Sequence, residues 1–414
     1  MTVETTLRVN GDRLWSSLMD LAKIGATPRG GVCRLALTEE DRRGRDWFKT
    51  RCEAMGLIVR ADAVGNQFAL LEGIESDLAP VMVGSHLDSQ PSGGKFDGTY
   101  GVLAGLEIAN VLREHNVVPR RSLEVVNWTN EEGSRFLPVM AGSGVFAGVH
   151  QIADVLTQID IDGTSFGDAL GRIDADGDHS GKDVVDAYFE LHIEQGPILE
   201  AESKTIGVVT GALGQRWFNC TVTGFEAHAG PTPMGIRRDA LQAAIAIIAD
   251  VDRIGRIDPD ARATVGMIDC WPNSRNTVPG RVTFSIDLRH AYDPGLDEMV
   301  ARLMDVLANV KVSHKVGIEI VPTNDWLACQ FDAGCVSLVR DAACASGHAW
   351  RDMVSGAGHD AVNIAKVAPT AMIFVPCRDG ISHNEIEDAT PSDLAAGADV
   401  LLAAVLARLN RTTD

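Results

Sequence analysis

A short apolar run that leads into histidine and aspartate constrains the fold more than any other part of the chain. Residues 81–85 read Val-Met-Val-Gly-Ser, and His86, Asp88 and Asp97 follow in a glycine-rich stretch. We interpret the run as a buried strand that stops before His86 and passes into a loop with one imidazole and two carboxylates. Open α/β sheets place their chemistry where strands end, so this loop predicts a functional edge of such a sheet.

Segments typical of strands and helices alternate on both sides of this loop. The strand-like runs cover 57–59, 67–71, 80–83, 123–128, 187–192 and 370–376. The helix-like segments cover 10–24, with Asn10 as N-cap, and 42–56, 102–115 and 392–409. The order strand, helix, strand favours an α/β domain, a mostly parallel mixed sheet with helices on both faces.

The middle of the chain follows a different pattern. Strand-like runs cover 206–210, 217–223, 263–268 and 282–288, and the helical segments there cover 237–251 and 296–307. This mixture predicts a smaller α+β domain inserted into the larger one. We expect the insertion to span 212–324, and the α/β domain to consist of 1–211 and 325–414.

Composition and charge argue against several classes of partner. Of 414 residues, 45% are hydrophobic and 23% charged, as in ordinary globular proteins. The formal net charge of −20 disfavours nucleic acid and anionic membranes, because both attract basic surfaces. The first ten residues do not form a signal peptide, and no stretch has the roughly 20 apolar residues of a membrane helix. The eight cysteines are dispersed, which is typical of reduced thiols, so we expect a cytoplasmic protein.

The glycine-rich stretch 91–95 does not predict a nucleotide site. It lacks the spacing and the terminal Lys-Ser/Thr of a P-loop, and no dinucleotide fingerprint lies at a strand-to-helix turn. We interpret it as a tight turn that brings Asp97 back toward His86.

Three further strand-like runs end in, or are soon followed by, residue types that bind metals. Glu131 and Glu132 follow one run, His192 closes another, and His383 comes shortly after a third. Each has an ordinary interpretation by itself, because a Glu-Glu pair is usually solvated and a lone histidine is more often structural. Imidazoles and carboxylates at four strand ends together predict a two-metal site, with one glutamate free to take a proton from water.

Six motifs carry a resemblance to a known family. They are Gly-Ser-His-Leu-Asp at 84–88, Gly-Lys-Phe-Asp-Gly at 94–98, Thr-Asn-Glu-Glu-Gly-Ser-Arg-Phe at 129–136, His-Ile-Glu-Gln-Gly-Pro at 192–197, Ala-His-Ala-Gly-Pro-Thr-Pro-Met at 227–234 and Ser-His-Asn-Glu at 382–385. Over nearly its whole length the chain resembles the hydantoinase/carbamoylase branch of the aminoacylase-like metallohydrolases. That branch contains N-carbamoyl-L-amino-acid hydrolases, metal-dependent β-ureidopropionases and allantoate amidohydrolases.

The resemblance implies a zinc-exopeptidase-like catalytic domain that holds two divalent metal ions per subunit. Asp97 is expected to bridge them, with His86 and His192 completing one ligand set and Glu132 and His383 the other. Zinc fits this expectation, and manganese, cobalt and nickel stay open because a nitrogen-and-oxygen ligand set suits several metals.

Further roles are implied by the same resemblance. Asp88 is expected to hold a ligand histidine in the right tautomer, and Glu131 to act as general base. The inserted domain is expected to act as a lid and to form a homodimer, in which His228 stabilises the oxyanion in the partner protomer's site. The expected substrate contacts are Gln195, Asn276, Arg289, Gly356, Ala357 and Gly358.

The implied reaction is hydrolysis of the carbamoyl group of a small N-carbamoyl amino acid, a ureido acid, to amino acid, ammonia and carbon dioxide. Allantoate amidohydrolase and β-ureidopropionase are alternatives on the same scaffold, as is an aminoacylase or dipeptidase. His192 favours the carbamoylase branch, because the peptidases commonly carry a carboxylate there. A metal-binding protein without catalysis is the remaining alternative, and Glu131 with a full ligand set argues against it.

Overall fold

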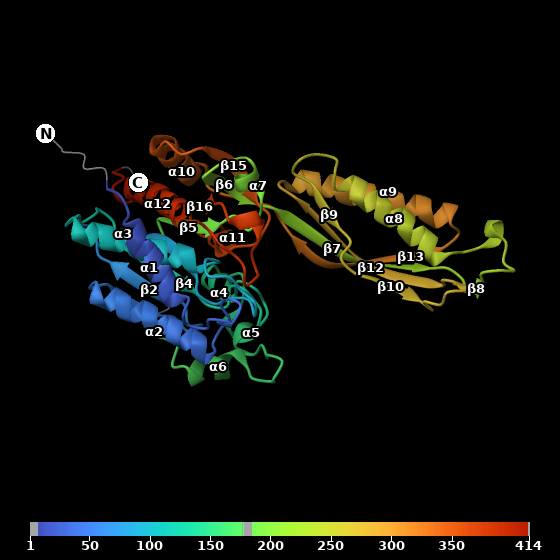
Figure 1. Cartoon of the computed structure of the whole chain (residues 1–414), viewed down its shortest axis with the longest axis horizontal. Coiled ribbons are helices and arrows are strands. Elements are labelled where there is room, and N and C mark those ends of the chain that lie inside the picture. Colours follow the sequence, from blue (N-terminus) through green and yellow to red (C-terminus); the bar gives the residue numbers. More distant parts are fainter. Residues whose placement is uncertain (1–6, 176, 178–183, 413–414) are drawn as a thin grey trace. The chain divides into compact units, whose positions relative to one another are not determined.

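The computed structural model describes residues 7–175, 177 and 184–412. The chain forms two compact units, one made of Met1–Gly211 and Phe331–Asp414 and the other of Ala212–Gln330 (Figure 1). Within the described residues, no helix combines the length and the apolar character needed to cross a membrane.

The first unit is built on a large sheet. Its strands are β1 (Ile58–Ala61), β2 (Gln67–Leu71), β3 (Val81–His86), β4 (Leu123–Trp128), β5 (Ala187–Ile193), β6 (Ile206–Ala212), β15 (Trp350–Ser355) and β16 (Thr370–Val375). They lie in the order β1-β2-β4-β3-β5-β16-β6, the short strand β14 (Cys329–Gln330) follows β6 at the edge, and β15 also pairs with β6. The central strands β4, β3, β5 and β16 run parallel, and the antiparallel pairings lie toward the flanks. The predicted fold class, a mixed sheet with helices, is confirmed.

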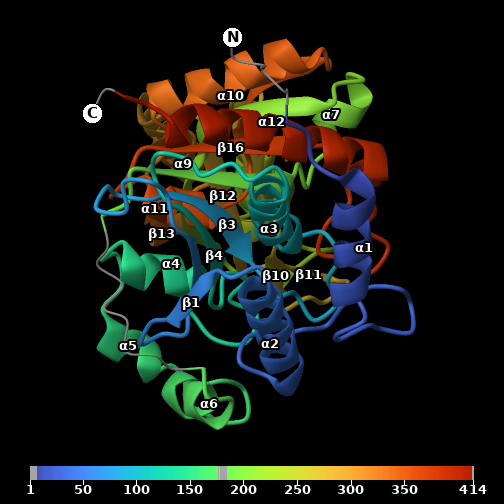
Figure 2. The same ribbon diagram turned by 90° about the vertical axis from the view of Figure 1, so that its left-hand side faces the viewer.

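Helices cover both faces of this sheet (Figure 2). They are α1 (Gly11–Leu21), α2 (Glu39–Ala54), α3 (Thr99–Glu114), α4 (Ala141–Phe146), α5 (Ile152–Leu156), α6 (Phe166–Arg172), α7 (Ile198–Ala201), α10 (Ala333–Ser346), α11 (Asp360–Ile364) and α12 (Pro391–Leu409), with a 3₁₀ turn η2 (Arg378–Gly380). Gly397 of α12 approaches the Leu191 side chain, whereas the Ala361 N–H of α11 donates to Glu190. Neighbouring residues of a strand point to opposite faces, so α11 and α12 lie on opposite sides of β5.

Several predicted boundaries change in the structure. The runs 67–71 and 123–128 are strands as predicted, and Asn10 caps α1 by accepting from the Arg13 N–H. However, β3 continues three residues past the predicted end at Val83, because Gly84 to His86 stay paired with β4. His86 therefore belongs to the strand and not to the loop. The short helices α4 to α6 and the strand β15 were not predicted, since they are too short to show a clear apolar period. The helix α10 was also missed, although its buried residues, among them Cys335 and Val339, recur at helical spacing.

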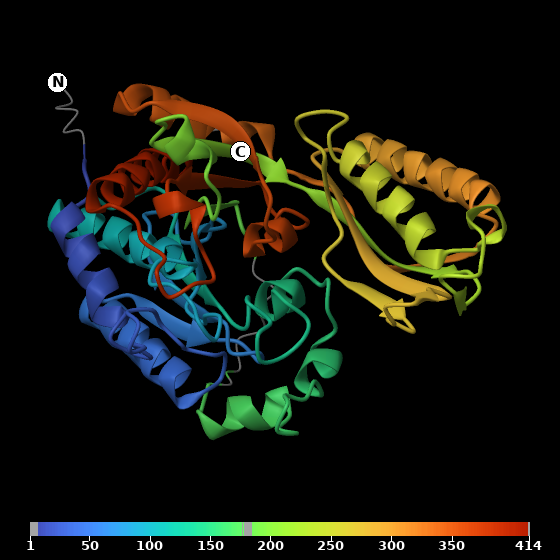
Figure 3. The same ribbon diagram turned by 45° about the vertical axis from the view of Figure 1, so that its right-hand side comes forward.

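The second unit is a separate α+β layer structure. Its elements are β7 (Gly214–Thr223), β8 (Ala227–His228), η1 (Met234–Ile236), α8 (Ala240–Ile254), β9 (Arg262–Thr264), β10 (Ile268–Trp271), β11 (Thr277–Val278), β12 (Arg281–His290), α9 (Asp293–Ser313), β13 (Gly317–Trp326) and β14 (Cys329–Gln330). An antiparallel sheet in the order β10-β12-β7-β13, with β9 beside β12, packs against α8 and α9, which lie side by side (Figure 3). The predicted single strand at 263–268 is two strands, β9 and β10, and β13 was missed.

Candidate active site

His86 and His192 reach the same edge of the sheet because of strand register. Val81 of β3 lies opposite Ala187 of β5 in a parallel pairing. Each histidine lies five residues further along its strand (81 to 86, and 187 to 192), so the two imidazoles emerge side by side. Both side chains are buried, and their ring centroids are 6.2 Å apart.

Asp97 meets these histidines from the loop before α3. Its Oδ1 lies 3.2 Å from Nε2 of His192 and 3.7 Å from Nε2 of His86. The next residue, Gly98, has a φ of +62°, and a Cβ there would lie 2.3 Å from the His86 ring. Glycine alone suits both the positive φ and the close approach. The motif at 94–98 thus places a carboxylate directly beside the strand ends.

Two groups of potential metal ligands share Asp97, and in each group the ligand atoms lie within 4.8 Å of one another. His86, Asp97 and His192 form the first, and Asp97, Glu132 and His383 form the second. In the second, Nε2 of His383 lies 3.4 Å from Oδ2 of Asp97 and 3.3 Å from Oε2 of Glu132. Imidazole nitrogens and carboxylate oxygens are the donors that zinc and related divalent ions take, so the residues fit metal binding.

The hydrogen bonds of the two buried histidines prepare them as ligands. Nδ1 of His86 lies 2.9 Å from the Asp88 carbonyl oxygen, and Nδ1 of His192 lies 2.9 Å from the Ile193 carbonyl oxygen. A carbonyl only accepts, so each Nδ1 carries a proton, and Nε2 is the atom left for a metal when the ring is neutral. Burial lowers the pKa of His86 to about 4, which favours the same neutral ring. Nε2 of His192 faces the Gly98 N–H at 3.0 Å, and Asp97 raises the pKa of this histidine to about 9 against the effect of burial.

Asp88 holds the turn that carries the two glutamates. Its Oδ1 accepts from the Glu131 N–H and its Oδ2 from the Glu132 N–H, both at 3.2 Å. The resemblance led us to expect this carboxylate on a ligand histidine, but Oδ1 lies 3.9 Å from Nδ1 of His86. The chain turns immediately after β3 and brings the Asp88 carbonyl, not the carboxylate, to the ring. One residue therefore orients His86 through its backbone and the acidic turn through its side chain.

Glu131 and Glu132 face different partners. Oε2 of Glu132 faces His383 in the second ligand group, whereas Oε2 of Glu131 lies 3.5 Å from Nε2 of His86 and belongs to neither group. Burial raises the pKa of Glu131 well above its ordinary value, and the charges of Asp360 and Glu132 raise it further. A carboxyl beside the ligand groups and outside both is suited to take and return a proton.

Gln195 and Ser382 contact the shared aspartate from two other loops. Nε2 of Gln195 donates to Oδ2 of Asp97 at 2.9 Å, and Oγ of Ser382 lies 2.8 Å from the same oxygen. The structure thus places Gln195, a predicted substrate contact, directly at the ligand groups.

The second unit brings two of the three predicted residues together. His228 of β8 lies opposite Thr277 of β11, and the Ala229 N–H donates to the Asn276 carbonyl oxygen at 2.9 Å. Arg289 lies apart, eight residues beyond Arg281 along β12, which at about 3.3 Å per residue is roughly 26 Å. Its guanidinium donates to the Asp287 carboxylate, with Nη2 2.9 Å from Oδ2. His228 and Asn276 therefore share one end of the unit, and Arg289 lies toward the other.

The predicted backbone donors lie in the turn between β15 and α11. The Ala357 N–H donates to Oγ of Ser355 at 3.1 Å and is thus engaged within the turn. Gly356 and Gly358 are exposed there, and their role as donors stays a prediction.

Comparisons with known proteins agree with this geometry. The model of Peptidase family M20/M25/M40 matches residues 82–407. The chain belongs to this family.

The chain is 47% identical to an N-carbamoyl-L-amino-acid amidohydrolase of Rhizobium meliloti over 401 residues, 96% of each chain. It is 37% identical to the allantoate amidohydrolase of Escherichia coli (strain K12), covering 92% of this chain and 94% of that one. A solved hydantoinase/carbamoylase family amidase from Burkholderia multivorans has 53% identity and a TM-score of 0.96, with 99% of this chain and 100% of that chain covered. The predicted family and the prediction of a hydrolase of carbon–nitrogen bonds are confirmed.

Two buried residues beside the ligand groups of this M20 family member had no predicted role. His359 lies edge-on against His192 with ring centroids 4.7 Å apart, and its Nε2 is 3.0 Å from Oγ of Ser355. Arg34 donates from Nε to the Leu87 carbonyl oxygen at 2.7 Å and so holds the turn after the first ligand histidine. The glycine-rich motif at 355–360 was a signal for His359, whereas nothing around Arg34 in the sequence marks it.

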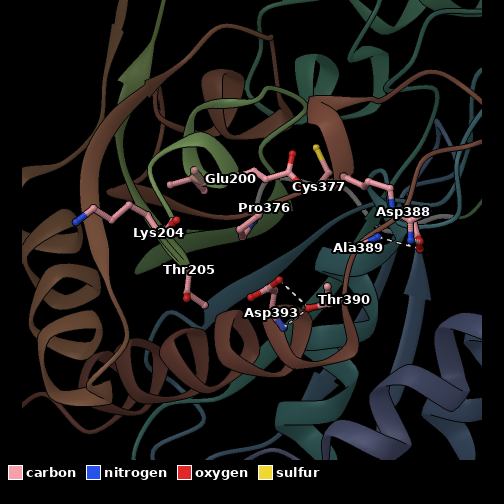
Figure 4. A pocket seen from close by; sticks show the side chains of 12 residues that line it. Glu200, Lys204, Thr205, Pro376, Cys377, Asp388, Ala389, Thr390 and Asp393 are labelled. Carbon is pink, nitrogen blue, oxygen red and sulfur yellow. Dashed lines mark hydrogen bonds and ion pairs between the residues drawn. The ribbon is translucent and has the colours of Figure 1, made fainter.

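A cavity of about 340 Å³ lies among α7, the turn after β16 and the start of α12 (Figure 4). Glu200, Lys204, Cys377 and Asp393 are among its lining residues, and the metal-ligand candidates are not. Asp393 accepts from the Thr390 hydroxyl in the cap of α12. We therefore treat the cavity as separate from the candidate active site.

Proposed function

We propose that this chain hydrolyses the carbamoyl group of small N-carbamoyl amino acids and releases amino acid, ammonia and carbon dioxide. The observation that carries the proposal is the pair of ligand groups that share Asp97, with Glu131 beside them and outside both. The name of the Rhizobium meliloti relative supports this substrate class.

The proposal includes two divalent metal ions per subunit. His86 and His192 would hold one, Glu132 and His383 would hold the other, and Asp97 would be shared by the two ligand groups. Zinc is our first choice, and manganese, cobalt and nickel accept the same donors. When bound, such ions polarise a carbonyl and lower the pKa of water.

In this proposal the chain's own residues supply proton transfer and orientation. Glu131 takes a proton from the attacking water and returns it to the leaving nitrogen, which departs as ammonia. The N-carboxy amino acid that remains then loses carbon dioxide and becomes the free amino acid. His228 donates to the developing oxyanion, a contact whose loss typically lowers turnover about 10²- to 10³-fold. The guanidinium of Arg289 holds the substrate carboxylate, which its planar pair of donors suits.

We also propose that the second unit acts as a lid and makes the active unit a homodimer. His228 and Arg289 lie toward opposite ends of the second unit, much further apart than the length of a ureido acid. If both contact one substrate, they come from two copies of the chain. The separation supports a shared site in which His228 and Asn276 belong to the partner and Arg289 does not. All eight cysteines are free thiols, which supports our placement in the cytoplasm.

Two readouts test the proposed reaction: release of ammonia from the ureido compounds, and release of the free amino acid from the N-acyl compound. The metal-stripped protein is compared with protein restored with zinc, manganese or cobalt, on an N-carbamoyl-L-amino acid, N-carbamoyl-β-alanine, allantoate and an N-acyl-amino acid. We expect kcat/KM to be highest for the N-carbamoyl-L-amino acid and activity to vanish on metal removal. Preferred cleavage of the acyl compound would contradict the proposal, and preference for allantoate would support the function named for the Escherichia coli relative.

A further inference from the structure

Glu387 is a buried carboxylate for which the predicted mechanism has no role. It lies between His383 and α12 with 2% of its surface exposed. Its Oε1 accepts from the Phe96 N–H at 3.0 Å and from the Asp97 N–H at 3.2 Å. These two amides set the backbone from which the shared carboxylate of Asp97 extends.

The other oxygen of Glu387 reaches the loop that carries His383. Oε2 lies 2.8 Å from Oγ of Ser382, and the same Oγ lies 2.8 Å from Oδ2 of Asp97. One carboxylate therefore joins two ligand-bearing segments that are nearly 290 residues apart in the chain. Both segments supply the second ligand group, which consists of Asp97, Glu132 and His383.

The Glu387 side chain fits against Gly94, which leaves room for its carboxyl group. A Cβ at Gly94 would lie 2.0 Å from the Glu387 carboxyl group, so that any larger residue at 94 would displace it. Burial of a carboxylate is costly unless hydrogen bonds compensate, and here two backbone N–H groups donate to one oxygen while the Ser382 hydroxyl, shared with Asp97, faces the other. Because burying this carboxylate costs free energy, its place beside the second ligand group points to a role in positioning the ligands.

We propose that Glu387 is a positioning residue that fixes Asp97 relative to His383 and thereby sets the metal affinity of the second ligand group. The proposal rests on the proposed metal-dependent function. It assigns Glu387 no contact with substrate. Replacing it should therefore change metal binding first, and turnover only through the metal.

Titration of metal-stripped full-length protein with Co²⁺ tests this role, because the visible absorption of the ion reports its ligands without any substrate. We expect Glu387→Ala to weaken Co²⁺ binding about 10- to 100-fold, as loss of a ligand's hydrogen-bond partner typically does. Glu387→Gln keeps an oxygen for the two amides and an amide nitrogen that can donate to Ser382, and should bind within a few-fold of wild type. Asp388→Asn is the matched control, since that half-buried side chain pairs with Arg378 and not with the ligand groups.

The outcomes distinguish a failure of this proposal from a failure of the proposed metal-dependent function. If Glu387→Ala binds Co²⁺ as Asp388→Asn does, the positioning role is overturned. If Glu387→Ala does not fold, Ser382→Ala decides, because it removes the hydroxyl that lies between Glu387 and Asp97 and, besides that, only a 3.3 Å contact with Nε2 of Gln195. Weaker Co²⁺ binding supports the role, and wild-type binding overturns it. A wild-type protein that binds no Co²⁺ would overturn the metal centre itself.

Discussion

Asp97 offers its two carboxylate oxygens to different partners, Oδ1 to His86 and His192 and Oδ2 to His383. Its neighbours in the chain are fitted to this role, since Gly98 leaves room for an imidazole and the Asp97 N–H is held by Glu387. At the scale of single residues, then, the site depends on backbone contacts as much as on ligand identity.

Asp360, a buried carboxyl that belongs to neither ligand group, gives a stability prediction. Burial and the charge of Glu190 raise the pKa of Asp360 well above its ordinary value, against a smaller opposing effect of Ser143. The folded state therefore keeps a proton that the unfolded chain loses above about pH 4. The free energy of unfolding then falls as pH rises, by at most about 1.4 kcal/mol per pH unit for this group.

Asp360→Asn removes that dependence. In the metal-stripped protein we expect the variant to gain stability over wild type as pH rises from 5 to 8, measured by urea unfolding at each pH. The two proteins should be closest in stability at the acidic end. A constant difference between them across this range would show that Asp360 does not keep its proton.

At the scale of elements, the register of the paired strands determines which side chains meet at the edge of the sheet. The pairing of β3 with β5 and β4 carries His86 to the same edge as His192 and Trp128. The turn after β4 is then fixed by Asp88. The loop into α3 completes the arrangement, and its Gly98 combines a positive φ with a close approach to the His86 ring.

Gly98→Ala should damage the site through a clash with the His86 ring. We expect a loss of roughly 2–3 kcal/mol in the free energy of unfolding and weaker Co²⁺ binding. Gly148→Ala is the control, because Gly148 also has a positive φ of 72° but nothing lies within 4 Å of an added Cβ. It should cost about 1 kcal/mol and leave Co²⁺ binding unchanged. Equal metal affinity of the two variants would argue against the clash.

The sequence predicted the elements of the parallel centre and the residues that meet there, because buried strands are continuous apolar runs and their ends carry the polar residues. It did not predict that His86 still belongs to β3, because strand ends depend on pairing with β4 and not on local composition. The carbonyl of Asp88 and the contacts of Glu387 were also out of reach. They depend on how distant segments fold back, which no local pattern records.

At the scale of the whole molecule, the second unit bears on whether one active site takes residues from two protomers. His228 and Asn276 lie together and Arg289 lies apart, so a shared site takes the first two from one protomer and the third from the other. Co-expressed His228→Ala and Arg289→Ala chains should then regain activity, up to about a quarter of wild type if pairing is random in a twofold dimer.

The combination of His228→Ala with Asn276→Ala is the control for that experiment. Both changes affect the same end of the unit, so every mixed site keeps a defect and no activity should return. Recovery in neither pair would mean that one protomer supplies all three residues or that Arg289 also comes from the partner.

The most direct test of the account compares the same substitution at two adjacent residues, Glu131→Gln and Glu132→Gln. Metal content and ammonia release from an N-carbamoyl-L-amino acid are measured on the same samples. We predict that Glu131→Gln keeps both metal ions per subunit and loses at least about 10²-fold in kcat, since general-base catalysis typically contributes 10²- to 10⁴-fold. Glu132→Gln should instead lose metal from the group that contains His383. Turnover of Glu131→Gln near the wild-type rate would contradict the account.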